Sequence, residues 1–205
     1  MVERKAHWES VYERAEPEQV SWFERHPEVS LRLIEAAELG PSSPILDIGG
    51  GTCSLVDALL DRGYRHLGVL DVSARAIGLA RERLGERADQ VEWYVGDITE
   101  FRSPHPWDLC HDRAVFHFLT DATDRGAYAE ALLDALAPGG QLVIATFGPD
   151  GPQRCSGLDT CRYDAEALRV ALGGDLELLQ QELVEHTTPS GAAQQFLFCR
   201  FQLGP

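Results

Sequence analysis

Short apolar runs alternate with amphipathic stretches along most of the chain. Between the runs, apolar residues recur at helical spacing, as at Leu55, Val56, Leu59 and Leu60. Strands that alternate with helices in this way are typical of βαβ units, in which helices cover both faces of a parallel sheet. The apolar runs themselves predict five buried strands, at residues 44–49, 66–71, 91–95, 107–110 and 141–147.

Two further strand-like runs complete the pattern, at residues 176–186 and 194–202. The connection between them is too short for a parallel crossover, so we expect an antiparallel pair. The predicted fold class is therefore α/β. It is a doubly wound, Rossmann-like, mostly parallel seven-stranded sheet with a C-terminal antiparallel strand pair.

The N-terminal stretch predicts helices. Pro27 opens one helix, which we expect to end near Gly40. An earlier helix is predicted from four apolar residues at helical spacing, Trp8, Val11, Tyr12 and Ala15. We therefore expect residues 1–43 to form an N-terminal helical cap on a core of residues 44–205. The 205 residues suit one domain overall.

Composition narrows the class of partner. The chain is 44% hydrophobic and 25% charged, which allows a real core, and its formal net charge is −15 at pH 7. Such an acidic chain repels phosphate backbones and anionic membranes, so neither nucleic acid nor a membrane is an expected partner. The opening residues hold no apolar run, and no stretch approaches the roughly 20 apolar residues of a membrane span. These features predict a cytoplasmic protein.

The five cysteines do not suggest a disulfide framework or a zinc site, because their number is odd and no CxxC pair occurs. We expect reduced thiols with structural roles, although Cys155 and Cys161 flank a glycine-containing loop and can meet in space. No metal site is predicted.

Acidic residues stand at three successive strand ends, where open parallel sheets bind ligands. Asp47 precedes the glycines Gly49, Gly50 and Gly51, a loop that lets backbone approach a ligand closely. A carboxylate there repels a pyrophosphate but favours a cation. Asp71 can accept hydrogen bonds from ribose hydroxyls or cap the next helix. Asp97 can accept from an adenine amino group or simply form a turn.

Taken together, LDIGGG, LGVLDVS, YVGDI and LAPGGQLVI resemble the ordered motifs of class I S-adenosylmethionine-dependent methyltransferases. The motifs lie within residues 44–147, and the expected architecture covers nearly the whole chain. One departure is Cys53, where the family often has a third glycine of its pattern. The resemblance implies S-adenosyl-L-methionine as cofactor and S-adenosyl-L-homocysteine as product.

The resemblance also implies residue roles. Asp47 and the three glycines face the methionine part of the cofactor, Asp71 binds ribose with Val72 beside the adenine, and Asp97 and Ile98 bind adenine. Trp22 and Arg113 are further expected cofactor contacts. In related enzymes, N-terminal segments fold over the cofactor. The aromatic residues Trp8, Tyr12, Trp22 and Phe23 can therefore line the pocket, or simply dock the cap on the sheet.

The segment after the fourth predicted strand, residues 110–118, lies beside the transferable methyl group in the family. His117 is a candidate general base, and Asp112 a candidate for orienting a substrate amine or a water. The alternative is structural, with His117 a satisfied histidine and Asp112–Arg113 a local ion pair.

The predicted function is methyl transfer to an O, N or S atom of a small molecule, since the chain has no appended recognition domain. A protein-lysine methyltransferase is the first alternative, and a thiol, selenol or metalloid acceptor the next. A non-catalytic cofactor-binding or interaction protein is the alternative of another class. A nicotinamide dehydrogenase is disfavoured, because the loop reads GGGTCS instead of GxGxxG and Asp47 precedes it.

Overall fold

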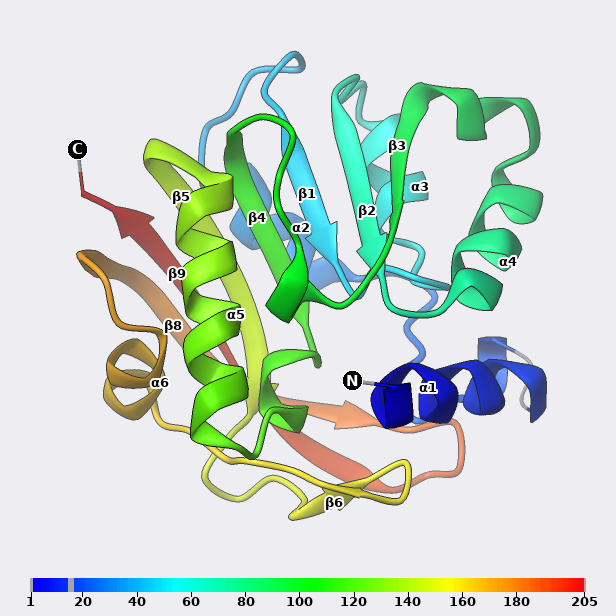
Figure 1. Cartoon of the computed structure of the whole chain (residues 1–205), viewed down its shortest axis with the longest axis vertical. Helices are drawn as coiled ribbons and strands as arrows, with labels where there is room; N and C mark the ends of the chain where they lie inside the picture. The colour runs from blue at the N-terminus through cyan, green and yellow to red at the C-terminus, as the bar shows by residue number, and fades with distance from the viewer. Residues whose placement is uncertain (1, 15–16, 205) are drawn as a thin grey trace.

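The computed structural model describes residues 2–14 and 17–204, and its centre is a seven-stranded sheet (Figure 1). The strands run in the order β3-β2-β1-β4-β5-β9-β8. β1 to β5 are parallel, and β9 pairs antiparallel with β8, as the sequence predicts, and also with β5. The strands are β1 (Ile45–Ile48), β2 (Leu67–Asp71), β3 (Val91–Val95), β4 (Trp107–Arg113), β5 (Leu136–Phe147), β8 (Leu176–Thr187) and β9 (Ala193–Leu203). A small hairpin, β6 (Arg154–Cys155) and β7 (Leu158–Asp159), lies in the loop after β5.

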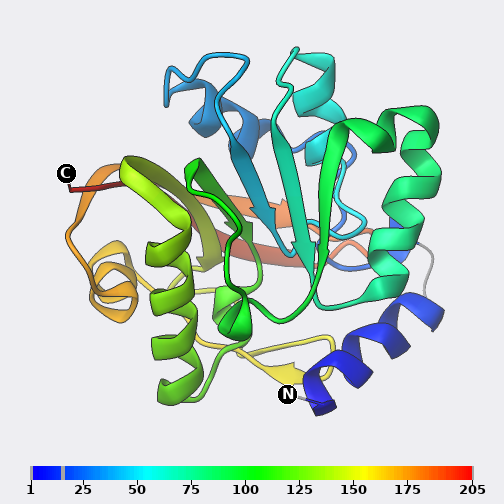
Figure 2. The ribbon, with the colours of Figure 1, turned by 45° about the horizontal axis from the view of Figure 1, so that its top comes forward.

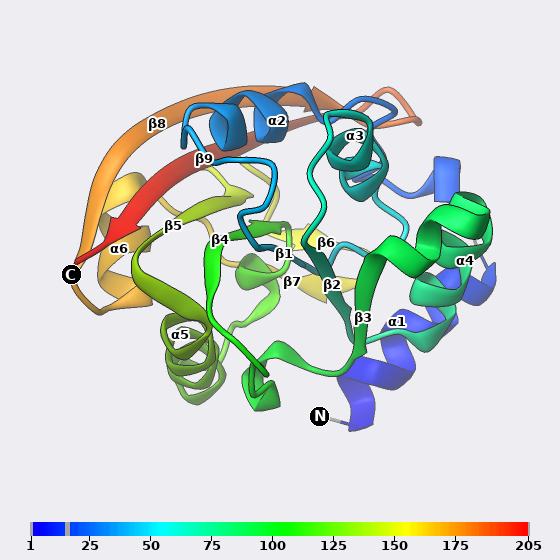
Figure 3. The same cartoon turned by 90° about the horizontal axis from the view of Figure 1, so that it is seen from above.

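Helices cover both faces of the sheet, and the view along the strands shows the two layers (Figure 3). One face carries α2 (Glu28–Glu35), α3 (Leu55–Asp61) and α4 (Ala74–Leu84), and the other α5 (Ala122–Ala135) and α6 (Ala165–Leu172). Along β5, Leu142 and Ile144 pack on the α5 face, while Val143 and Ala145 pack on the α2 face. This period of two follows from strand geometry and explains why the apolar runs are continuous.

Two helices begin at capping side chains, and a third helix ends earlier than the sequence predicts. The Ser73 hydroxyl accepts the N–H of Ala76 at the start of α4, and an oxygen of Asp164 accepts that of Ala167 at the start of α6. α2, however, ends at Glu35 and does not reach Gly40. The chain turns there because Glu38 takes a positive φ of 55°.

The N-terminal helix α1 (Val2–Arg14) lies apart from the two layers, below the arrowheads of β2 and β3 (Figures 1 and 2). The N-terminal helix is thus confirmed, whereas the division into a cap of residues 1–43 and a core of residues 44–205 stays a prediction. Ala15, the last apolar position used to predict this helix, lies outside the described residues. Among the described helices, none has the length and apolar character needed to cross a membrane.

Candidate functional site

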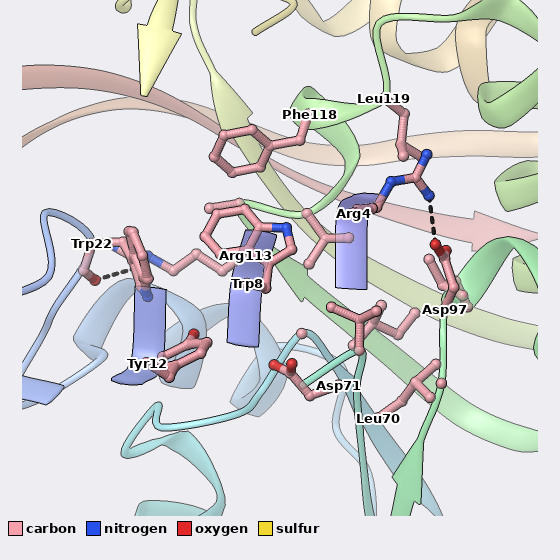
Figure 4. Close-up of a pocket in the computed structure, with 17 residues that line it drawn as sticks. Arg4, Trp8, Tyr12, Trp22, Leu70, Asp71, Asp97, Arg113, Phe118 and Leu119 are labelled. Carbon is pink, nitrogen blue, oxygen red and sulfur yellow. Dashed lines mark hydrogen bonds and ion pairs between the residues drawn. The ribbon is translucent and has the colours of Figure 1, made fainter. Parts of the chain in front are cut away.

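Two adjoining cavities lie at the carboxyl ends of the parallel strands. They are neighbours because Tyr12, Trp22, Gly49 and Arg113 line both. The first cavity, drawn in Figure 4, is also lined by Arg4, Trp8, Ile48, Leu70, Asp71, Val72, Gly96, Asp97, Ile98, Ala114, Val115, Phe118 and Leu119. The second is also lined by Val20, Phe23, Glu24, Asp47, Gly50, Thr52, Cys53 and His111.

The sheet topology explains why the predicted residues meet. β3, β2, β1 and β4 are neighbours and parallel, so their carboxyl ends lie side by side at one edge of the sheet. Every residue predicted to contact a cofactor lines one of the two cavities except Gly51, which lies against the Asp71 carboxylate. The ligand roles of these residues stay predictions, but their juxtaposition is a property of the fold.

Asp47, near the carboxyl end of β1, is the buried acid of the second cavity, with 3% of its surface exposed. Its Oδ1 accepts a hydrogen bond from His111 Nδ1 at 2.7 Å, and the Ser30 hydroxyl lies 2.9 Å from Nε2 of the same ring. Among the described residues, no donor reaches Asp47 Oδ2. A buried carboxylate oxygen is costly without a partner, so this atom calls for a donor or cation from a ligand in the second cavity.

Asp71 is the buried acid of the first cavity and is 6% exposed. Its Oδ1 accepts the N–H of Ser73 at 2.8 Å. Burial raises the pKa of Asp71 to about 7, and the negative charge of Asp47 acts in the same direction. A ligand that donates hydrogen bonds to this carboxylate would stabilise its ionised form.

Asp97 already has partners on both oxygens. Thr99 donates to Oδ1 through its N–H at 3.1 Å and its hydroxyl at 2.9 Å, and Arg4 Nη1 donates to Oδ2 at 2.7 Å. Arg4 also pairs with Asp124. The first turn of α1 is therefore tied to the acid that we predicted to bind adenine (Figure 4).

The glycine loop is shaped by close contacts. A Cβ on Gly49, whose φ is +70°, would lie 2.1 Å from a methyl carbon of Val115. A Cβ on Gly50 would lie 2.4 Å from Asp47 Oδ2, and one on Gly51 would lie 2.5 Å from Asp71 Oδ2. The next position that departs from the family pattern, Cys53, is accommodated in the second cavity. Burial raises the pKa of its thiol to about 12, so the thiol is neutral.

Arg113 fixes the segment that leads from α1 to α2. Its Nη1 donates to the carbonyl of Trp22 at 2.7 Å, and its Nη2 lies 2.9 Å from Glu24 Oε1. The guanidinium stacks over the Phe196 ring at 5.0 Å, and His186 Nε2 donates to the carbonyl of Ser21 at 2.8 Å. The segment over both cavities is thus held by side chains from the sheet.

Aromatic side chains form one wall of the first cavity. Trp8 packs edge-on against Trp22 at 5.5 Å and against Phe118 at 5.0 Å. Both alternatives for the N-terminal aromatic residues therefore apply, since these side chains dock α1 and also line the cavity. Phe23 lines the second cavity instead.

The structure places Asp112 away from both cavities. Along β4, Asp112 points to the α5 face, where it accepts the N–H groups of Val115 and Phe116 and the hydroxyl of Tyr128 at 2.9, 3.2 and 2.5 Å. Burial raises the pKa of Asp112 to about 6. Its oxygens are committed to the turn after β4, so the geometry argues against our expectation that it orients a substrate.

His117 is also fully buried and lines neither cavity. Its Nδ1 accepts the N–H of Phe147 at 3.1 Å, and the ring stacks on Phe147 at 4.2 Å. Burial, together with the charge of Arg113, lowers the pKa of His117 to about 3. A neutral ring that is buried in the core, away from both cavities, argues against the general base expected from the sequence.

The sequence analysis missed Arg4 and His111. Arg4 lies four residues before Trp8 and eight before Tyr12, so the three share one face of α1, a pattern visible in the sequence once the cation is counted with the aromatic residues. His111 lies opposite Asp47 in the β1–β4 pairing. Only the strand register reveals that contact.

Comparisons with known proteins give matches to methyltransferases. Residues 45–140 match the model of a family described as "Methyltransferase domain". The chain is 32% identical to nodulation protein S of Rhizobium tropici over 132 residues, which are 64% of this chain and 54% of that protein. It is 28% identical over 105 residues to the ubiquinone biosynthesis O-methyltransferase of Aromatoleum aromaticum, covering 50% of this chain and 43% of that protein. The chain thus spans about half the length of the curated relatives it matches.

Among solved structures, the chain resembles the N-methyltransferase NodS of Bradyrhizobium japonicum WM9. The TM-score is 0.68 at 25% identity, over 87% of this chain and 96% of that one. The complex of NodS with S-adenosyl-L-homocysteine gives a TM-score of 0.72 at 24% identity, over 96% and 98% of the two chains.

Proposed function

Because the chain belongs to the class I S-adenosylmethionine-dependent methyltransferase superfamily, we propose that it binds S-adenosyl-L-methionine across the two cavities and transfers the methyl group to a small molecule. The acceptor atom is an O, N or S nucleophile. S-adenosyl-L-homocysteine is the product that remains in the cavities after transfer.

The observation that carries this proposal is the Asp47 oxygen in the second cavity for which the described residues provide no donor. S-adenosyl-L-methionine carries an α-ammonium group, which supplies both the positive charge and the hydrogen-bond donors that this buried oxygen requires. His111 and Ser30 hold the other side of the carboxylate, so its orientation is set before the ligand arrives. A pyrophosphate at the same place would meet a buried negative charge, which disfavours a dinucleotide.

The first cavity suits the nucleoside part. Asp71 accepts hydrogen bonds from the ribose hydroxyls, and Val72 and Ile98 pack on the adenine ring. Asp97 faces the adenine amino group, with Arg4 as its competing partner. The methyl group then lies where the cavities join, beside Trp22, Gly49 and Arg113.

The chemistry asked of this chain is positioning. Methyl transfer is a one-step displacement at a carbon activated by positive sulfur, and holding the nucleophile in line about 3 Å away supplies most of the rate. A base is required only where the nucleophile must lose a proton. Asp112 and His117 hold the turn that carries Val115 and Phe118 into the first cavity. We propose them as positioning residues.

A small acceptor is favoured by the cover over the first cavity. Arg4 and Glu9 anchor α1 at two points of its rim, and the Trp8–Trp22–Phe118 wall is apolar. One relative is, in addition, named for the biosynthesis of a small molecule, ubiquinone. An extended protein segment would have to displace α1 to reach the junction of the cavities.

Titration calorimetry with S-adenosyl-L-methionine and with NAD tests the cofactor, and we expect binding of the first alone. Incubation with methyl-labelled cofactor and separate panels of metabolites and lysate proteins tests the acceptor. Label confined to protein bands would overturn the small-molecule proposal in favour of a protein acceptor. Cofactor binding without turnover on either panel would indicate a non-catalytic protein.

A further inference from the structure

We propose that His66, Glu92 and His105 bind a divalent transition-metal ion, of which Zn²⁺ fits best. His66 directly precedes β2, Glu92 is the second residue of β3, and His105 lies just before β4. These are the amino ends of the strands, at the top of Figure 1, whereas both cavities lie at the carboxyl ends. The proposal for this His–Glu–His cluster is independent of the proposed function.

The spacing of the ligand atoms supports the site. Within the described residues, this is the one group of three such side chains whose ligand atoms all lie within 4.8 Å of one another. His66 Nε2 lies 3.1 Å from Glu92 Oε1, and His105 Nε2 lies 3.1 Å from Oε2. Two ligands of a tetrahedral Zn²⁺ with bonds of about 2.0–2.1 Å are about 3.3 Å apart. Each histidine is therefore already near the separation from Glu92 that the ion requires.

Neighbouring groups form hydrogen bonds with His105 and Glu92 and so orient these two side chains. His105 Nδ1 lies 3.2 Å from the carbonyl oxygen of Pro106, which can only accept, so Nδ1 carries a proton. In neutral imidazole the lone pair is then on Nε2, which faces the Glu92 carboxylate. The Tyr94 hydroxyl also donates to Glu92 Oε2. A histidine that donates its second N–H to a carbonyl, beside a hydrogen-bonded carboxylate, is the usual outer arrangement of a metal site.

The loop that carries His105 is fixed in place. Trp107 is fully buried and donates through Nε1 to the Ser103 hydroxyl at 2.7 Å, and that hydroxyl donates to the carbonyl of His105 at 2.6 Å. The Trp107 ring packs on His105 at 4.3 Å and on His66 at 5.8 Å. Binding would therefore cost little ordering of this loop.

The donor set selects the ion. Two imidazole nitrogens and one carboxylate match Zn²⁺, whereas Mg²⁺ and Ca²⁺ prefer oxygen ligands alone. The three side chains are 30–42% exposed, so water can take the fourth position. The bound ion would clamp the loop before β4 to β2 and β3. We therefore assign it a role in stability.

The experiment uses the full-length chain, free of any affinity tag and stripped with a chelator. Co²⁺ is titrated and followed by visible absorption, and Zn²⁺ affinity is measured by competition with a chromophoric chelator. The variants are Glu92→Gln, which keeps the size of the side chain, and His105→Ala. His26→Ala is the control, because His26 is exposed and lies in another part of the chain.

We expect one Co²⁺ per chain with a tetrahedral spectrum, and a Zn²⁺ affinity at least tenfold lower in both variants but unchanged in the control. Zn²⁺ at one hundred times its Kd should raise the Tm of the wild type by about 5–10 °C. Binding that persists in Glu92→Gln but is lost after thiol alkylation would place the ion on cysteines and overturn the proposal. Absence of any 1:1 binding would also overturn it. If His105→Ala does not fold, Glu92→Gln decides.

Discussion

Both ends of the parallel sheet carry carboxylates, which are buried at one end and partly exposed at the other. At the carboxyl-end edge, Asp47 and Asp71 are 3% and 6% exposed, and one oxygen of Asp47 has no donor among the described residues. At the amino-end edge, the side chain of Glu92 is 39% exposed and lies within hydrogen-bond distance of His66, His105 and Tyr94. At the first edge a buried carboxylate oxygen lacks a partner among the described residues, whereas at the second edge both carboxylate oxygens have polar neighbours.

This difference teaches where a ligand is required and where it is optional. A buried carboxylate without a partner pays a large desolvation cost, so a cationic ligand gains much by completing it. A half-exposed carboxylate is already screened by water and by its neighbours, so a cation adds less. We therefore expect substitutions at the carboxyl-end edge to act on binding of the proposed cofactor, and those at the amino-end edge to act on Zn²⁺ binding and on stability.

The largest effect is expected for Asp47→Ala. The substitution removes the carboxylate that we assign to the α-ammonium group of the cofactor, and S-adenosyl-L-homocysteine carries the same ammonium group. We expect the affinity of the protein for S-adenosyl-L-homocysteine, measured by titration calorimetry, to fall by at least about 2 kcal/mol, or roughly thirtyfold. Glu92→Ala removes a carboxylate from the other edge and is the matched control. Equal losses in the two variants would erase the contrast between the edges.

Asp71→Ala should have the next largest effect, a loss of about 1–3 kcal/mol in the affinity for S-adenosyl-L-homocysteine. The reason is the loss of a charge-assisted acceptor for the ribose hydroxyls. Asp61→Ala, which removes an exposed acid from α3, is the control. An unchanged affinity in a folded Asp71 variant would contradict the ribose role.

The pH dependence of binding is a second test of the ribose role of Asp71. Since the pKa of Asp71 is raised to about 7 by burial, the carboxylate is partly protonated at neutral pH. Affinity for S-adenosyl-L-homocysteine should therefore rise from pH 6 to pH 8, and fall toward tenfold per pH unit well below 7. Asp71→Asn should flatten this dependence. A wild-type profile that is flat between pH 6 and 8 would mean that another group binds the ribose.

Without ligand, the free energy of unfolding should fall as the pH rises, whereas the affinity for S-adenosyl-L-homocysteine should rise. The folded pKa of Asp71 lies above its ordinary value of 3.8, so the folded state binds more protons between these values. Its contribution to the free energy of unfolding is fully present below about pH 4 and is lost as the pH rises through about 7. Urea unfolding of wild type and Asp71→Asn at pH 5 and pH 8 measures this difference.

A smaller effect is expected where α1 is anchored beside the first cavity. Glu9 accepts the N–H groups of Ala74 and Arg75 and the hydroxyl of Ser73, and so caps α4 from another helix. Glu9→Ala should cost about 1 kcal/mol in the free energy of unfolding and speed hydrogen exchange in residues 2–14. Glu13→Ala, an exposed change on the same helix, should do neither. Unchanged exchange in the Glu9 variant would show that the other contacts of α1 suffice.

The fold could be predicted because its signals are local. Apolar runs and helical spacing of apolar residues each report a short stretch of chain. Asp47, Asp71 and Asp97 could be placed together because the carboxyl ends of parallel strands meet at one edge. No knowledge of side-chain packing was needed for either step.

The remaining site residues depend on contacts that periodicity does not encode. His111 and Asp112 are neighbours in sequence, yet the first points to the α2 face with Asp47 and the second to the α5 face with Tyr128. A shift of one residue in β4 would exchange them. The pairing of Arg4 with Asp97 depends on where α1 docks, 93 residues away in sequence. The His–Glu–His cluster likewise joins three separate segments.

The smallest effect is expected between the two edges. β2 alone separates them by five residues, about 16 Å of extended chain, and groups that far apart with no shared partner usually act additively. The affinity for S-adenosyl-L-homocysteine should therefore change less than twofold between Zn²⁺-loaded and chelator-treated protein, and Zn²⁺ affinity should change equally little when that ligand is bound. In the double variant Asp71→Ala/Glu92→Gln, the loss in the free energy of binding S-adenosyl-L-homocysteine should equal the sum of the losses in the two single variants to within about 0.5 kcal/mol. A larger reciprocal coupling would mean that the sheet transmits strain from one edge to the other, since coupling between two binding sites must appear in both affinities.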